Sequence, residues 1–172
     1  MPDRSTLEGL PPEDLVALME DAAKNWLAMD GLWFLAVEER FGLEMAIELD
    51  RAVWERFSPI EARRILKRRG ISPGGGLPSL AEALRFRLYA GINEQEIRWT
   101  DNGTLVLVMK TCRVHEARNR DGRLPFPCRS VGLVEYSAFA HAVDPRIHAR
   151  CLGCPPDRPE GAWCAWEFSV EP

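Results

Sequence analysis

The feature that most restricts how this chain of 172 residues can fold is a change in the spacing of its apolar residues. From Glu13 to Tyr89 they recur every three or four residues, which gives a helix one buried face. From Glu94 onward they alternate or form short runs, as strands do. The pattern predicts a single α+β domain over residues 1–172, with a helical part (1–92) before a sheet part (93–172).

The helical part is predicted to hold four or five helices, separated by local capping signals. Asp30 is expected to cap the second helix, and Gly42 to end it in a left-handed conformation. Ser58, followed by proline, is predicted to start another helix. Ser79 with Glu82 forms a capping box, which predicts a last helix running to Tyr89.

The sheet part is predicted to form a small, mainly antiparallel sheet of four strands on which the helices pack. The sequence Asp-Asn-Gly at 101–103 indicates a hairpin, and the apolar run 105–109 is expected to be a central strand. An arginine-rich loop at 116–127 and one helix at 128–144 are expected between strands two and three. In the last strand Cys164, Trp166, Phe168 and Val170 should share one face.

Charge and composition exclude several functional classes. The net charge is −4 and no basic stripe is present, which argues against nucleic acid as a partner. No apolar run approaches the ~18 residues that a membrane span requires. The first fifteen residues lack the apolar core of a signal peptide, so we expect a cytoplasmic protein with reduced thiols.

The cysteines give the clearest chemical signal. Cys151 and Cys154 form a Cys-x-x-Cys turn, with Cys128 before it and Cys164 after it. Four thiolates suit tetrahedral zinc, and an iron–sulfur cluster is the alternative. Cys112 or His115 could replace one of these four cysteines as a ligand. The competing interpretation is that these cysteines are small buried apolar residues.

No recognisable catalytic set is present, so the functional hypotheses stay broad. The first is a small-molecule-binding protein in which zinc locks the C-terminal hairpin beside an apolar pocket. The second is a metal-dependent hydrolase of small amides or ring compounds, with Glu135 or His115 as the candidate base. A purely structural, dimeric protein with free thiols is the third.

Several segments together resemble an uncharacterised prokaryotic family whose members are labelled only as cytosolic proteins. They include NWLAMDGLWFLAVEERFG, FPCRSVGLVEYSAFAHAVDPRI, CLGCPPD and CAWEF. More distantly, the C-terminal half resembles the 4-vinyl reductase domain, on Cys151, Cys164 and Phe168. That resemblance implies an α+β small-molecule-binding domain, sometimes zinc-bearing and often a homodimer. The helical part is similar to the aminothiazoline-carboxylate hydrolase-like family, and neither similarity implies a particular substrate.

Overall fold

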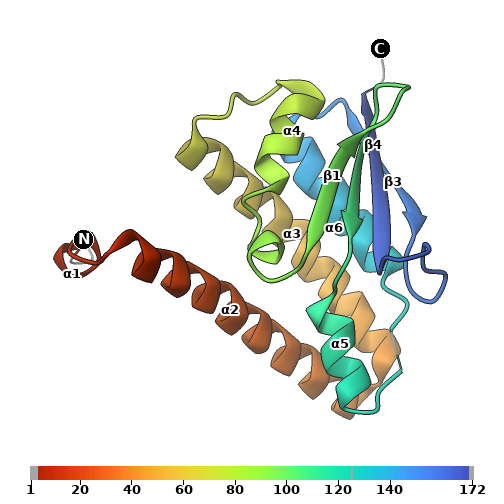
Figure 1. The fold of residues 1–172 in the computed structure, drawn as a ribbon. Coiled ribbons are helices and arrows are strands. Elements are labelled where there is room, and N and C mark those ends of the chain that lie inside the picture. Colours follow the sequence, from red (N-terminus) through yellow and green to blue (C-terminus); the bar gives the residue numbers. More distant parts are fainter. Residues whose placement is uncertain (1–3, 125, 171–172) are drawn as a thin grey trace.

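The structure is a computed structural model that describes residues 4–124 and 126–170. Helices fill the first half and an antiparallel sheet the second, which confirms the predicted α+β class (Figure 1). The helical half contains α1 (Ser5–Glu8), α2 (Pro12–Phe41), α3 (Leu43–Arg69), α4 (Gly76–Leu84) and the 3₁₀ helix η1 (Leu88–Gly91). The second half contains β1 (Gln95–Trp99), β2 (Leu105–Met109), α5 (Arg113–Arg120), α6 (Arg129–Val143), β3 (Ile147–Gly153) and β4 (Cys164–Val170).

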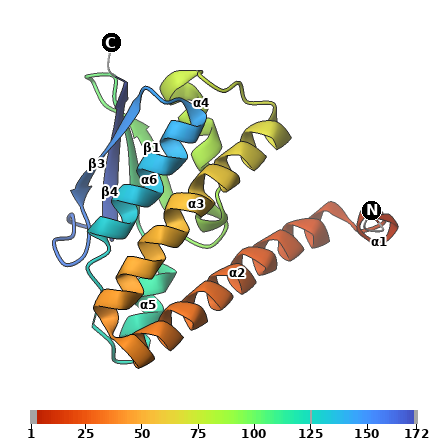
Figure 2. The same ribbon diagram turned by 180° about the vertical axis from the view of Figure 1, so that it is seen from behind.

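The sheet has the strand order β1-β2-β4-β3, and each pair of neighbouring strands is antiparallel. All five residues of β2 are buried, which confirms the prediction of a central strand. Trp166 and Phe168 of β4 pack with α6 and α3 in the main core, on the face that the alternation predicts. Figure 2 shows α3 and α6 lying along this face, while α2 leaves the body of the protein toward its N-terminal end.

Two of the predicted helix breaks are wrong. Asp30 starts no helix, because α2 continues through it for 30 residues. Ser58 and Pro59 lie inside α3, which runs unbroken for 27 residues. A proline removes only one backbone donor, and packing of the surrounding helix against α6 offsets that loss. Only Gly42, at a positive φ of 87°, separates α2 from α3.

The start of α4 also differs from the prediction. Ser79 lies within the helix, and its Oγ donates to the Ser72 carbonyl at 3.2 Å. The helix begins earlier because the Gly76 N–H donates to the carboxylate of Asp144 at 2.9 Å. Asp144 comes from the end of α6, which stops before Pro145 as predicted. A residue 68 positions away in the sequence therefore fixes where α4 begins.

Part of the segment expected to be a loop between β2 and β3 is a second helix, α5, which runs from Arg113 to Arg120. This helix is only eight residues long and mostly polar, which is why its sequence resembles a loop. The buried side chains of His115 and Arg118 hold it against the rest of the protein. Among the described residues, no helix is long and apolar enough to cross a membrane.

Candidate functional site

A cavity of about 570 Å³ lies where α2, α3, α5 and α6 meet the ends of β2 and β4. Its inner wall is aromatic and apolar and includes Trp54, Tyr89, Met109, Tyr136 and Trp166. Five carboxylate residues also line it: Asp30, Asp50, Glu116, Asp121 and Glu135. Cavities of this size with a few polar groups are typical of small-molecule sites.

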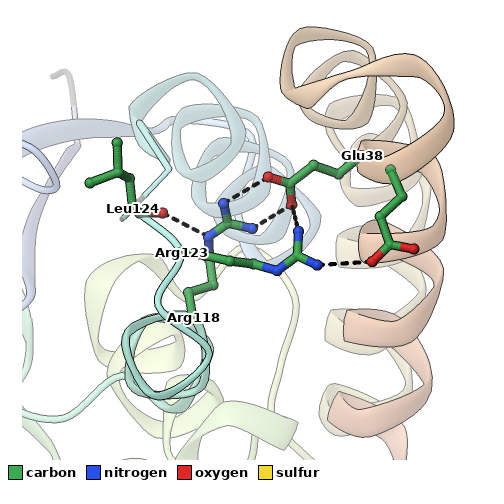
Figure 3. Close-up of polar contacts among 5 residues, drawn as sticks. Glu38, Arg118, Arg123 and Leu124 are labelled. Atoms are coloured by element: carbon green, nitrogen blue, oxygen red, sulfur yellow. Dashed lines mark hydrogen bonds and ion pairs between the residues drawn. The ribbon is translucent and has the colours of Figure 1, made fainter.

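Helix α2 forms the outer wall of the cavity because ionic contacts tie it to α5 (Figure 3). Arg118 donates two hydrogen bonds to the carboxylate of Glu38, at 2.7 and 2.9 Å. Its Nε donates to the Leu124 carbonyl at 3.0 Å, so the guanidinium is fixed from two sides. The hydrogen bonds from Arg118 lower the pKa of Glu38. Arg123 adds an ion pair to the neighbouring Glu39 at 2.8 Å.

An aromatic cluster fills the base of the wall between α2, α3 and η1. Trp26 of α2 lies edge-on to Trp54, with ring centroids 5.9 Å apart, and edge-on to Tyr89 at 5.3 Å. Trp54 stacks on Tyr89 at 5.6 Å. Aromatic pairs at these distances stabilise a folded protein by more than the burial of their apolar surface alone provides. The cluster therefore gives the cavity a rigid inner surface.

A buried arginine stands behind the cavity and balances two carboxylates. The Nε of Arg87 donates to Glu61 at 2.9 Å, and its Nη1 lies 2.8 Å from Glu135 Oε1. All three side chains are under 10% exposed. The pKa of Arg87 is raised despite its burial, because Glu61 and Glu135 favour its charged form. Breaking such a buried network leaves an uncompensated charge.

Three carboxylates of the cavity hold protons unusually tightly. Burial raises the pKa of Glu135 to about 7, even though Arg87 opposes the shift. Burial also raises the pKa of Asp50 to about 7, and repulsion from Asp30 and Glu135 adds to the effect. Burial raises the pKa of Asp30 as well. Removal from water thus disfavours the charged forms of all three carboxylates.

Three side chains that line this cavity carry a buried polar atom with no hydrogen-bond partner among the described residues. One is His115 Nδ1, whose ring is 2% exposed and lies between Phe126 and Trp163 in parallel stacks. The others are Trp166 Nε1 and Glu135 Oε1, and the latter lies 2.8 Å from Arg87 Nη1, which balances its charge. Such atoms in a folded protein are uncommon and mark places where a ligand or water completes the bonding.

Both predicted catalytic candidates therefore line the cavity. Glu135 has a pKa near neutrality, as a general base at physiological pH requires. His115 differs, because burial, with Arg118 and Arg158 nearby, lowers its pKa to about 4. Its imidazole is therefore neutral at pH 7 and has one ring nitrogen available as a hydrogen-bond partner.

The predicted cysteine ligands fall into two neighbouring groups. Cys151 Sγ lies 3.6 Å from Cys154 Sγ, and Cys128 is close enough to Cys154 to lower the pKa of its thiol. Cys164 lies on the core face of β4 and lines the cavity together with Cys112 and Cys128. All five cysteines are free thiols.

The thiols of the first group shift one another's pKa values. Hydrogen bonds from Cys128 lower the pKa of Cys154 to about 6, and Cys151 and Arg129 act in the same direction. The pKa of Cys151 rises to about 11, chiefly through burial. Within residues 4–124 and 126–170, no three His, Cys, Asp or Glu side chains are arranged to hold one metal ion. The four-cysteine metal site thus stays a prediction.

Comparison with known proteins places the chain in a family. Residues 8–170 match a family model described as a family of unknown function, DUF6125. The chain belongs to DUF6125. The match agrees with the resemblance to an uncharacterised family, and it gives no support to the 4-vinyl reductase or hydrolase-like similarities, which stay predictions. No curated protein matches this DUF6125 chain.

Several residues of the site in this DUF6125 chain were not found by sequence reasoning. Asp50 and Arg87 belong to no recognisable sequence motif, and the sequence predicted Asp30 only as a helix cap. The available signal was the spacing of Asp50 and Trp54, which puts a carboxylate one turn from a buried indole on α3. The indole N–H of Trp54 is in turn a hydrogen-bond donor to Asp50.

Proposed function

We propose that this protein binds a small organic molecule in the cavity between α2, α3, α5 and α6. The observation that carries the proposal is this cavity, whose lining holds two buried side chains with a polar atom that lacks a hydrogen-bond partner among the described residues, His115 Nδ1 and Trp166 Nε1. A ligand that bonds to them removes a cost of about 1–3 kcal/mol for each. The aromatic wall supplies the apolar contact area that such sites use.

A fragment screen by ligand-observed NMR tests this proposal. Ala28 lines the cavity from α2 and its side chain is exposed, so Ala28→Trp should obstruct the mouth without disturbing the core. Ala22 is exposed on the same helix and does not line the cavity, which makes Ala22→Trp the matched control. We expect most fragment hits to disappear in Ala28→Trp and to remain in Ala22→Trp. An identical set of hits in both variants contradicts the proposal.

A zinc site is a second candidate function, and the approach of three thiols supports it. The sulfur atoms of Cys151 and Cys154 lie 3.6 Å apart at the end of β3, and Cys128, at the start of α6, lies close enough to lower the pKa of Cys154. Three thiolates with Cys164 or a water as the fourth ligand would suit zinc, and an iron–sulfur cluster uses the same donors.

Metal analysis of protein purified without a histidine tag tests the zinc proposal. Stoichiometric zinc that is lost in Cys154→Ser and retained in Cys112→Ser supports it. Absence of metal in the wild-type protein, after growth with added zinc, rejects it. Metal-dependent hydrolysis would require such an ion beside the cavity, with Glu135 as the base. It therefore fails together with the metal site.

A further inference from the structure

The carboxylates of the cavity differ in whether a cation pairs with them. Four carboxylates lie in or behind the inner wall, and Arg87 is the cation that pairs with Glu61 and Glu135. In the described part of the chain, no cation lies within ion-pair distance of Asp30 or Asp50. The folded protein therefore keeps two partly buried carboxyl groups near each other without a counter-charge.

The other cations that line the cavity do not supply this charge. Lys24 pairs with Asp21 at 3.2 Å, Arg118 with Glu38, and Arg123 with Glu39. Arg113, which is exposed on α5, has no ion pair among the described residues. None of these cations, nor Arg120, which pairs with Asp121 at 3.9 Å, lies within ion-pair distance of Asp30 or Asp50 among the described residues.

The aromatic residues beside these carboxylates have the faces that bind cations. Trp54 and Tyr89 both line the cavity and stack on each other, and the Arg87 guanidinium already lies 5.8 Å from each ring centroid. Tyr136 lines it from α6. A cation over an aromatic face is stabilised most when both are removed from water. Buried His115 Nδ1, which has no partner in the described residues and lies at the same cavity, offers an additional neutral hydrogen-bond site for the body of a ligand.

We propose that the ligand of this cavity is an organic amine, whose ammonium group pairs with Asp30 and Asp50 while its apolar body contacts the aromatic wall. The inference rests on the proposed function and specifies its ligand class. An ammonium ion satisfies both requirements of the wall at once, since it carries the missing charge and is attracted to aromatic faces. A neutral or anionic molecule of the same shape satisfies only the apolar part.

Calorimetry with three indole probes of equal shape tests the charge preference. Tryptamine carries an ammonium group, tryptophol a hydroxyl group, and indole-3-propionate a carboxylate. We expect tryptamine to bind at least tenfold more tightly than tryptophol, and indole-3-propionate to bind most weakly. Asp50→Asn should reduce the preference for tryptamine to less than threefold while the affinity for tryptophol is unchanged. Glu55→Gln, on the exposed side of α3, is the matched control and should keep the preference.

Each other outcome overturns the inference. If tryptophol or indole-3-propionate binds as tightly as tryptamine, the charge preference is absent and the cavity binds a different class of molecule. If none of the three probes binds while the fragment screen finds hits, the amine assignment fails and the proposed function stands. If the screen also fails, both are rejected. Displacement of tryptamine by millimolar Mg²⁺ assigns the carboxylates to a metal ion instead. Should Asp50→Asn not fold, Asp30→Asn replaces it with the same expected loss of preference.

Discussion

Arg118 and Glu38 join α5 to α2 through two hydrogen bonds of 2.7 and 2.9 Å (Figure 3). The Arg118 side chain is 7% exposed and that of Glu38 is 15% exposed, so water competes little for this pair. The two residues stand 80 positions apart in the sequence. Their contact holds the outer wall of the cavity, and it connects the stability of the fold with the presence of the candidate site.

Replacing Glu38 should therefore loosen the wall. We expect Glu38→Gln to lower the free energy of unfolding by about 1–3 kcal/mol, because the buried guanidinium loses a charged partner. Amide hydrogen exchange should become faster in α5. Glu39→Gln is the matched control, since Glu39 is 62% exposed and its ion pair contributes at most about 1 kcal/mol. Equal effects of the two variants would contradict this account.

Removing Arg87 should have the largest effect on stability. Arg87→Met leaves the buried carboxylates of Glu61 and Glu135 without a counter-charge. We expect the free energy of unfolding in urea to fall by about 3–5 kcal/mol. Arg85→Met, two residues away and exposed, should change it by less than about 0.5 kcal/mol. A small loss in Arg87→Met would show that the network is not needed for folding.

Two glycine-to-alanine substitutions should act in opposite directions. At Gly132 of α6 a Cβ would overlap the indole of Trp166, with Cη2 only 2.7 Å away. Gly132→Ala should destabilise the protein by about 1–3 kcal/mol, because the helix must move off the sheet. At Gly31 of α2 a Cβ meets nothing within 4 Å, so Gly31→Ala should stabilise it by about 0.5–1 kcal/mol. Thermal unfolding of both variants checks the two signs together.

Stability should depend on pH through Asp50. Its folded pKa of about 7 exceeds the ordinary value of 3.8, so the folded protein binds this proton more tightly than the unfolded chain. The contribution of Asp50 to stability is therefore lost as the pH rises from 3.8 to about 7. Asp50→Asn removes that loss, so its stability relative to wild type should rise by about 2–3 kcal/mol from pH 5 to pH 8. Urea unfolding across this range measures the difference, and a constant difference would refute the shift.

A thiolate should form near pH 6 in the cysteine cluster. Hydrogen bonds from Cys128 lower the pKa of Cys154 to about 6, and Cys128→Ala removes them. Thiolate absorbance at 240 nm should rise near pH 6 in the wild-type protein, and this step should be absent in Cys154→Ser. In Cys128→Ala it should move to higher pH. Cys112→Ser, outside the thiol–thiol contacts, should keep the step unchanged, and its loss there would show that the thiolate is elsewhere.

The local pattern of the sequence determined most of the secondary structure. Periods of three to four residues predicted the helices, and alternation predicted the buried face of β4. The break at Gly42 was readable because a positive φ favours glycine. Capping signals at Asp30 and Ser58 were misleading, because tertiary packing outweighs a cap of about 1 kcal/mol in a long helix.

The tertiary structure alone decided which polar groups meet. Asp144 caps a helix 68 residues away, Glu38 binds Arg118 across 80, and Asp30 lies near Asp50 only because α2 folds back on α3. No spacing rule encodes such pairs, since each depends on how helices pack in three dimensions. The cysteines show the same difference between what the sequence predicts and what packing decides. The sequence identified the Cys-x-x-Cys turn, but packing placed Cys128 beside it and directed Cys164 toward the cavity.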